Sequence, residues 1–420
     1  MELTFKYVSV NDMVFSNETA VRDGTIYIDK DEMERMIRQD PHIENVRIDI
    51  ARPGESVRIM PVKDVLEPRI KLDEQGGYFA LTGVTPDRIG RGETLVLKGA
   101  AVVLTSPLAS YMEGILDMSG EAARYTPFSK TCNLVLWIET KEDISFYEKQ
   151  LAQHMAARKA ALCLAEHARD HKIADSETFS WEPERSDLPR YGLVHMFTCR
   201  HVDTLVYGKD VAGFIPPLVN PLAAIDGGIE CLSCRVSAHR PPTFYHENNP
   251  SVMGALRRHG KELNFVGVLV SLHENTQSFK EKNAHMCVEL MKMLQLDCAI
   301  IIEENKGNPD VDLMLVCKQA ERAGIKIVLM TDESAGEDGA SQGMADIVQE
   351  ADAIVTNGNC NAKININPME RVLGDPSLFG KISGTSFEDL QDDGSYNVEL
   401  LCIPSACNQM GYTTLTCVDV

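Results

Sequence analysis

Two cysteines three positions apart, Cys231 and Cys234, form the one close cysteine pair in this 420-residue sequence. A C-x-x-C pair has three interpretations: a redox dithiol, half of a zinc site, or coincidence in a chain that holds 12 cysteines. A structural zinc site needs a second close pair or two histidines at fixed spacing. The next histidines, His239 and His246, are seven positions apart, so we expect no metal site.

A thioredoxin-like pair opens a helix, whose dipole lowers the pKa of the first thiol. Here Arg235, Pro241 and Pro242 follow the pair, and this sequence does not favour a helix. Spacing alone therefore leaves a redox dithiol and coincidence equally open.

The residues before the pair predict a β-rich region and one long helix. Short apolar runs separated by Gly, Pro and Asp indicate strands in the first 145 residues. From Phe146 to Ile173 helix formers dominate and apolar residues keep helical spacing, with one interruption at Arg158-Lys159. This region is therefore expected to be α+β.

After the pair, short aliphatic runs alternate with helical patterns. The predicted strands are Asn264–Ser271, Cys298–Ile302, Lys326–Met330 and Ala353–Thr356, and the predicted helices are Glu281–Leu294, Asp310–Ala323 and Gly343–Glu350. Buried strands that alternate with helices predict a doubly wound, mainly parallel α/β domain, which we place at about residues 251–365. The fold class of the chain is therefore predicted to be α/β, with a β-rich α+β region first.

In such a sheet, ligands bind beyond the carboxyl ends of the strands. Three of these ends carry carboxylates, in His273-Glu274, Glu303-Glu304 and Thr331-Asp332. A small amine-bearing ligand or a partner surface would suit this edge, although solvated loops explain the same polarity. No turn carries the glycine-rich phosphate motif of a Rossmann or P-loop enzyme.

Composition excludes two classes of partner. The formal net charge is −21 and no basic block offsets it, which disfavours nucleic acid and anionic membrane. No apolar run approaches the roughly 20 residues that a membrane helix needs, and the N-terminus has no signal-peptide pattern. We therefore expect a cytoplasmic protein.

Longer motifs run along nearly the whole chain. They include DIARPGESVRIMPVKDVLEPR (Asp49–Arg69), YTPFSKTCNLVL (Tyr125–Leu136), DGGIECLSCRVSAHRPPTFYHENNP around the cysteine pair, and TDESAGEDGASQ (Thr331–Gln342). In this order they resemble component B, the alpha/beta subunit proprotein, of the clostridial glycine, sarcosine and betaine reductases.

The resemblance implies a proprotein that cleaves itself between Ser233 and Cys234 and converts Cys234 into a pyruvoyl group. The Cys234 thiol would attack the Ser233 carbonyl to give a thioester, and elimination and hydrolysis would leave a ketone at the new N-terminus. The cut would divide the chain into residues 1–233 and residues 234–420. The family commonly has Asn before the cleaved cysteine, whereas this chain has Ser233, and Cys231 is the rival position.

The resemblance also implies a reaction and its partners. In the family the pyruvoyl group forms an iminium with an amine substrate, and a partner's selenol or thiol then cleaves the C–N bond reductively. The expected partners are a selenocysteine- or cysteine-containing component B subunit, the small selenoprotein component A, the acetyl-phosphate-forming component C, and a small amine or amino acid. Two alternatives are an unprocessed, non-catalytic ligand-binding paralogue and a dithiol redox protein that uses Cys231 and Cys234.

Five further residues are candidates for supporting roles. His239 and His246 flank the cleavage site in sequence and would move protons. Asn248 and Asn249 would orient the cleaved end or the substrate, and Arg52 would bind a substrate carboxylate. Solvated loops, local hydrogen bonds or an ordinary salt bridge would explain the same residues.

Overall fold

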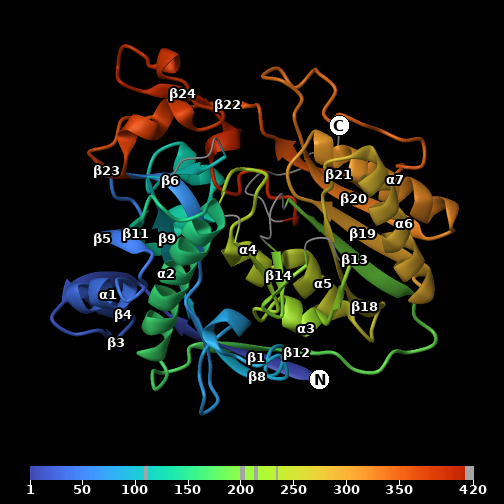
Figure 1. Cartoon of the computed structure of the whole chain (residues 1–420), viewed down its shortest axis with the longest axis horizontal. Coiled ribbons are helices and arrows are strands. Elements are labelled where there is room, and N and C mark those ends of the chain that lie inside the picture. The colour runs from blue at the N-terminus through green and yellow to red at the C-terminus, as the bar shows by residue number, and fades with distance from the viewer. Residues whose placement is uncertain (108–111, 199–203, 212–215, 233–234, 412–420) are drawn as a thin grey trace.

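The computed structural model describes residues 1–107, 112–198, 204–211, 216–232 and 235–411. Figure 1 shows an N-terminal lobe on the left and a large parallel sheet on the right, with the segments around residue 230 between them. The architecture is mixed α/β, with a β-rich N-terminal part and a doubly wound second part, which confirms the predicted fold class.

The N-terminal lobe is built from three sheets. The largest has the order β10-β6-β9-β11-β5, from Gly114–Asp117, Val57–Leu66, Ala100–Thr105, Cys132–Thr140 and Ile43–Ala51. A second has the order β12-β1-β8-β7, from Asp175–Ser180, Glu2–Ser9, Gly92–Lys98 and Arg69–Lys71. The third joins β2 (Asp12–Ser16), β4 (Thr25–Asp29) and β3 (Ala20–Arg22), and α1 (Lys30–Ile37) follows it.

The long helix of this lobe, α2 (Phe146–Glu166), packs against β9 and β11. Ser145 and Glu148 form a capping box that satisfies the first amides of α2. The predicted helix is thus confirmed, but it ends at Glu166, before Ile173. His154 and Arg158 on α2 are buried, which explains why the apolar face of this helix is interrupted in the sequence.

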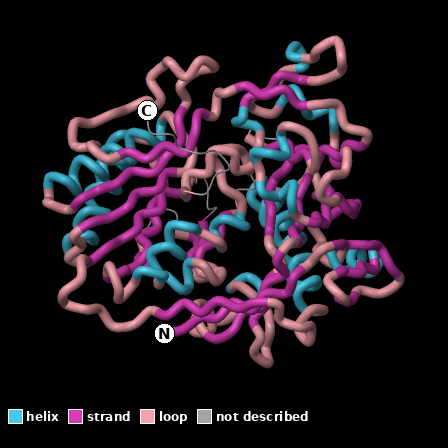
Figure 2. Tube along the Cα trace, turned by 180° about the vertical axis from the view of Figure 1, so that it is seen from behind, coloured by secondary structure: helices cyan, strands magenta, loops and turns pink. Residues whose placement is uncertain are grey.

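The doubly wound sheet has the strand order β16-β18-β13-β19-β20-β21. Its members are Leu218–Val219, Asn264–Leu272, Arg190–Phe197, Cys298–Glu303, Lys326–Glu333 and Ile354–Asn359. All neighbours are parallel except the edge pair β16 and β18. Helices α6 (Gln277–Met293) and α7 (Asn308–Arg322) cover one face, and α3 (Pro221–Ala224) and α5 (Pro250–Arg258) lie on the other (Figures 1 and 2).

Two strands pair with strands from the other side of the predicted boundary at residue 233. β13, from the first part of the chain, lies between β18 and β19 in the second sheet, and β23 (Arg371–Gly374), from the second part, pairs in parallel with β6. The largest apolar core likewise draws residues from both parts, including Val57 and Val268. The two predicted segments therefore fold as one body.

The remaining elements are short. In the described ranges they are β14 (Thr204–Val206), β15 (Lys209–Asp210), β17 (Ile229–Cys231), α4 (Thr243–Glu247), β22 (Lys363–Ile366), β24 (Tyr396–Glu399) and 3₁₀ turns at Ala80–Thr82, Ala122–Tyr125, Pro127–Lys130, Pro376–Lys381, Phe387–Asp389 and Leu400–Cys402. The predicted helix Gly343–Glu350 is wrong, because this stretch forms bends and turns. The backbone amide of Ala345 donates instead to Asp310 on α7, at 2.5 Å.

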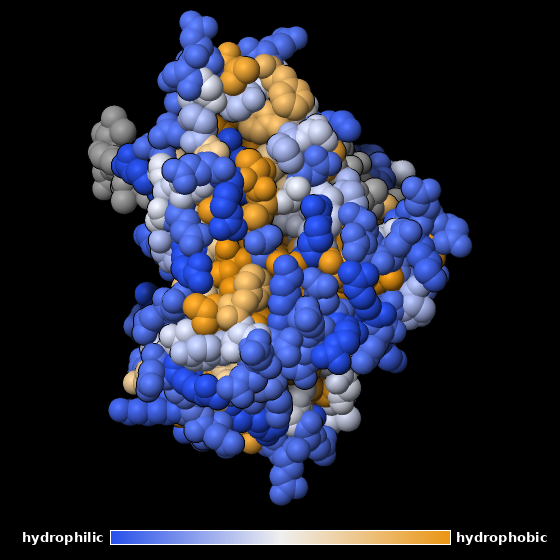
Figure 3. All heavy atoms as spheres, turned by 90° about the vertical axis from the view of Figure 1, so that its left-hand side faces the viewer, coloured by the Kyte–Doolittle hydropathy of each residue, from blue (hydrophilic) through white to orange (hydrophobic). Residues whose placement is uncertain are grey.

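Figure 3 shows the face that bears the N-terminal lobe, where a strip of apolar side chains runs among hydrophilic ones. Large exposed apolar residues in the chain include Phe15, Val372, Phe387 and Leu390. Across the described ranges, no helix is long and apolar enough to cross a membrane.

Candidate functional site

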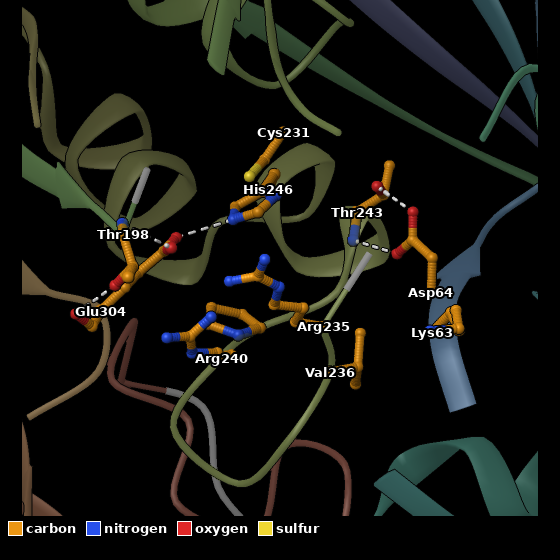
Figure 4. Close-up of a pocket in the computed structure, with 11 residues that line it drawn as sticks. Lys63, Asp64, Thr198, Cys231, Arg235, Val236, Arg240, Thr243, His246 and Glu304 are labelled. Carbon is orange, nitrogen blue, oxygen red and sulfur yellow. Dashed lines mark hydrogen bonds and ion pairs between the residues drawn. The ribbon is translucent and has the colours of Figure 1, made fainter. Parts of the chain in front are cut away.

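A cavity lies between the N-terminal lobe and the carboxyl end of the doubly wound sheet (Figure 4). Its walls come from β6, from the residues after β13 and β19, from the end of β17, and from α4 and the segment that leads into it. The lining residues are Lys63, Asp64, Thr198, Cys231, Arg235, Val236, Arg240, Pro241, Thr243, His246 and Glu304. Polar groups thus gather at the sheet edge where ligands of this fold class bind.

The two residues of the predicted cleavage site, Ser233 and Cys234, lie outside the described residues. Cys231 before them and Arg235 after them both line the cavity. Described residues on both sides of this position therefore belong to the cavity wall. Cys231, the rival position, is the last residue of β17 and pairs with Thr204 in a regular ladder.

His246 and Glu304 form the central charged pair of the cavity. His246 on α4 is buried, and its Nε2 lies 2.8 Å from Oε1 of Glu304. The Nε2 of His195, on β13, lies 3.0 Å from the same oxygen. The ring of His195 stacks on Phe197 with centroids 3.9 Å apart, which fixes its orientation. One carboxylate oxygen thus holds two imidazoles in place.

The environment separates the protonation states of the two histidines. Burial opposes charge on His246, but the Glu304 carboxylate outweighs burial and raises the pKa of His246. Burial also lowers the pKa of His195, and Glu304 offsets this only in part. Burial opposes the charge of Glu304 as well, yet both histidines hold the pKa of that carboxyl well below its usual range. The cavity therefore contains a charged His246–Glu304 pair beside a neutral His195.

Two arginines project into the same space (Figure 4). Arg240 is buried, and the buried Nε of Arg235 makes no hydrogen bond within the described part of the chain. The Arg235 guanidinium also lies over the ring of Phe146, 5.6 Å from its centroid. Guanidinium groups donate in pairs to carboxylates, so this wall of the cavity suits an anionic ligand.

A buried network of charges supports the cavity from the N-terminal lobe. Glu230 accepts from His154 at 2.6 Å and from Arg158 at 2.7 Å. Arg158 also pairs with Glu247 at 2.5 Å. On the cavity wall, Asp64 accepts from the backbone amide of Thr243 at 2.9 Å and from its hydroxyl at 2.6 Å. These contacts hold both sides of the predicted cleavage site, at Glu230 and at Thr243, against the first lobe.

Asn248 belongs to the same buried network. Its Oδ1 accepts from Arg69 at 2.6 Å, and its Nδ2 donates to Glu67 at 3.1 Å. Asn249 caps α5, because its Oδ1 accepts from the amides of Ser251 and Val252. Neither asparagine lines the cavity.

Arg52 also lies apart from the cavity. Its guanidinium donates to Asp12 at 2.6 Å, to Glu55 at 3.1 Å and to the carbonyl of Met13 at 2.6 Å. The structure therefore uses Arg52 to join the loop after β5 to β2, and does not bring it to the lining residues.

His239 lies in a second cluster of polar groups. It is fully buried, and its Nδ1 is 3.4 Å from Oδ2 of Asp332. In the described ranges, two groups of side chains have ligand atoms close enough to hold a metal ion: His195, His246 and Glu304, and His239, Asp332 and Cys360. The two predicted histidines, His239 and His246, thus lie in different clusters.

Sequence reasoning missed several residues that line or support the cavity. Glu304 stands out in the sequence only as part of a polar strand end, and His195, Arg235 and Arg240 are not predicted as site residues. His195 lies inside an apolar strand, and a polar residue there is a usable signal because buried polar groups need partners. The arginines carry no such signal, since their placement depends on how the segment after the cysteine pair folds.

Comparisons with known proteins agree along the whole chain. The family model described as "Glycine/sarcosine/betaine reductase component B subunits" matches residues 1–418. The chain is 40% identical to the glycine reductase complex component B subunits alpha and beta of Peptoclostridium acidaminophilum, over 99% of both sequences. It is 35% identical to the sarcosine reductase complex component B subunit alpha of the same organism, again over 99% of both.

A more distant relative is the D-proline reductase proprotein PrdA of Acetoanaerobium sticklandii, with 22% identity over 78% of this chain and 54% of that protein. No solved structure matches the chain significantly. The family match over nearly every residue confirms the resemblance found in the sequence, and the chain belongs to the family of glycine/sarcosine/betaine reductase component B subunits.

Proposed function

We propose that this chain is the self-processing, substrate-binding subunit of a reductase that acts on a small amino acid or amine. The observation that carries the proposal is the family match over residues 1–418, joined to a cavity whose wall holds the residues on both sides of Ser233 and Cys234. The names of two relatives, glycine reductase and sarcosine reductase, support a small amino acid as substrate. The name of a third relative, a proline reductase proprotein, supports processing.

Processing would begin when the Cys234 thiol attacks the carbonyl of Ser233. The C–N bond of that peptide breaks as the thioester forms, and the freed nitrogen takes up a proton. The charged His246 at the cavity wall is a suitable donor for this proton, because Glu304 keeps it protonated. Cys231 is less suited as the nucleophile, since its backbone is held in the β17 ladder.

The residues around the cavity fit a carbonyl group at residue 234. Arg235, Arg240 and His246 are cationic donors that line the cavity. A pyruvoyl group there would supply a ketone that draws electrons from a bound amine. The two arginines would bind the substrate carboxylate and place its amine toward the ketone.

The chain would work within a complex. Its relatives are named as components of multi-component reductases. A partner subunit of component B would bring the selenol or thiol that cleaves the C–N bond, and components A and C would take the product onward.

Variants of the two cysteines test the proposal. Cys234→Ala should remain one chain on denaturing gels, whereas Cys231→Ser should be cut like the wild type. Cys234→Ser should be cut more slowly, since a hydroxyl can begin the same shift but is a weaker nucleophile. Cleavage that persists in Cys234→Ala, or is lost in Cys231→Ser alone, would move the site to Cys231. An uncut wild-type chain, also in the presence of its partner proteins, would contradict processing altogether.

A further inference from the structure

A buried group of metal-ligand side chains lies beside the cavity but is not part of its lining. It consists of His239 from the segment before α4, Asp332 near the end of β20, and Cys360 just after β21. All three are buried, and one ligand atom from each lies within 4.8 Å of the other two. The three residues come from distant parts of the sequence, so no sequence motif identifies them as a group.

Both ring nitrogens of His239 and one carboxylate oxygen of Asp332 are buried without a hydrogen bond in the described ranges. Neither ring nitrogen of His239 has a hydrogen-bond partner in the described ranges, although the side chain is fully buried. Oδ2 of Asp332 is likewise buried without one. Leaving such groups without a hydrogen bond destabilises the folded protein, and buried polar groups in native proteins nearly always have a hydrogen-bond partner. A ligand that both groups could share would remove this cost.

The geometry matches a tetrahedral zinc ion. His239 Nδ1 and Asp332 Oδ2 are 3.4 Å apart, which is close to the edge of about 3.3 Å expected between N and O ligands at about 2.0–2.1 Å from zinc. Cys360 adds a sulfur, and a mixture of N, O and S donors suits zinc better than magnesium or calcium. Lys306 donates to Cys360 Sγ at 2.9 Å, so this sulfur already accepts from a cationic group in the structure.

We propose that His239, Asp332 and Cys360 bind one zinc ion. Gln409 would act as a positioning residue, because its Nε2 donates to the other oxygen of Asp332 at 2.7 Å and so orients the carboxylate. Cys407 is the candidate for a fourth ligand, since it is buried and its amide donates to the carbonyl of Ala238, next to His239, at 3.3 Å. A water molecule is the alternative fourth ligand.

The zinc ion would join the segment that follows the predicted cleavage site to two strands of the doubly wound sheet. His239 lies five residues after Cys234, whereas Asp332 belongs to β20 and Cys360 directly follows β21. The ion would therefore anchor this segment while the chain before it is cut. The metal site itself does not depend on the proposed function, because an uncut chain carries the same three ligands.

Metal content of the purified full chain tests the proposal. We expect about one zinc per chain in the wild type, and at least about a fivefold loss in Cys360→Ser and in Asp332→Asn. Gln409→Ala should keep the site but weaken zinc affinity about 10–100-fold in competition with a chelator. Cobalt substituted for zinc should show a thiolate-to-metal charge-transfer band in the wild type.

Two matched variants show whether the ion binds at these three side chains. Cys298→Ser removes a thiol at the opposite end of the same sheet and should keep both the zinc and the cobalt band. His246→Gln disrupts the other cluster of ligand-type residues and should also keep them. A wild-type chain that binds no zinc when zinc is supplied, or shows no thiolate band with cobalt, would overturn the proposal. Loss of zinc in His246→Gln with retention in Cys360→Ser would also overturn it.

Discussion

At the scale of single residues, the cavity depends on how one buried carboxylate is shared. Glu304 holds His246 and His195 through the same oxygen, at 2.8 and 3.0 Å. The pKa of His246 is raised and that of His195 is lowered, so His246 is the protonated, charged imidazole and His195 is neutral. Neighbouring groups whose pKa values are driven apart are typical of acid–base chemistry, so His246 is the proton donor in the proposed mechanism.

Replacing Glu304 by Gln should destabilise the protein most at mildly acidic pH. The raised pKa of His246 contributes stability that is fully present below its unfolded value of about 6.5 and is lost as pH rises through the folded value. The lowered pKa of Glu304 contributes stability above its unfolded value of about 4.3, and this stability is lost only as pH falls through the folded value. The stability lost in Glu304→Gln should therefore be greatest at pH values between these two unfolded pKa values, at about 3–5 kcal/mol. It should shrink toward pH 9.

Melting temperatures of the wild type and Glu304→Gln at several pH values measure this difference. Glu350→Gln, which breaks an exposed ion pair with Arg322, is the matched control and should change stability by about 0–1 kcal/mol. A difference between wild type and Glu304→Gln that does not depend on pH would contradict the charged His246–Glu304 pair.

Arg235 should matter for substrate affinity. Replacing it by Gln removes a charge-assisted hydrogen bond worth about 1.5–3 kcal/mol, which corresponds to a rise in KM of roughly 10–100-fold. The reconstituted reductase complex is the system for this measurement. Arg257→Gln is the control, because Arg257 forms an exposed ion pair with Glu177 and should leave KM unchanged. Equal KM values for Arg235→Gln and the wild type would remove Arg235 from the proposed carboxylate site.

At the scale of elements, the sequence predicts well what depends on local pattern. The four predicted aliphatic strands of the second half are confirmed as β18, β19, β20 and β21. β18, inside the sheet, is buried on both faces, whereas β21 at the edge is only partly buried. Their polar ends predict the position of the site. The helix predicted at Gly343–Glu350 fails because a tertiary contact from Asp310 to Ala345 determines that stretch.

The candidate site was less predictable than the fold. His246 could be found because it follows the cysteine pair within a recognisable motif, whereas Glu304 and His195 reach it through the packing of β19 and β13. Arg52 is a natural candidate for a substrate carboxylate because its charge is visible in the sequence, but its partners Asp12 and Met13 are distant along the chain. Contacts between residues that only tertiary structure brings together cannot be predicted from the spacing of those residues in the sequence.

Asn249 should act through the stability of α5. As the N-cap it accepts from two amides of the helix, and replacing an N-cap by Ala costs about 0.5–2 kcal/mol. Asn249→Ala should therefore lower the melting temperature without raising KM, and Asn249→Ser should restore most of the stability because serine also caps. A raised KM in the well-capped Asn249→Ser variant would show instead that Asn249 contacts the substrate.

At the scale of the whole molecule, processing should not separate the two products. β13 from the first product is a central strand of the second sheet, and β23 from the second product pairs with β6 of the first. A buried ion pair between Arg158 and Glu247 also joins the products. The fragments should therefore elute together in size-exclusion chromatography and separate only in denaturant. Elution of a free fragment under native conditions would contradict this interleaved architecture.

The central claim is that Cys234 becomes the pyruvoyl group of a reductase subunit. Intact-mass analysis of the denatured protein, with and without borohydride, tests it most directly. The account predicts two fragments that meet between Ser233 and Cys234, with the second lacking the nitrogen and sulfur of its first residue and gaining two hydrogen atoms on reduction. A single chain of 420 residues, unchanged by borohydride and still uncut when produced together with its partner subunits, would contradict it.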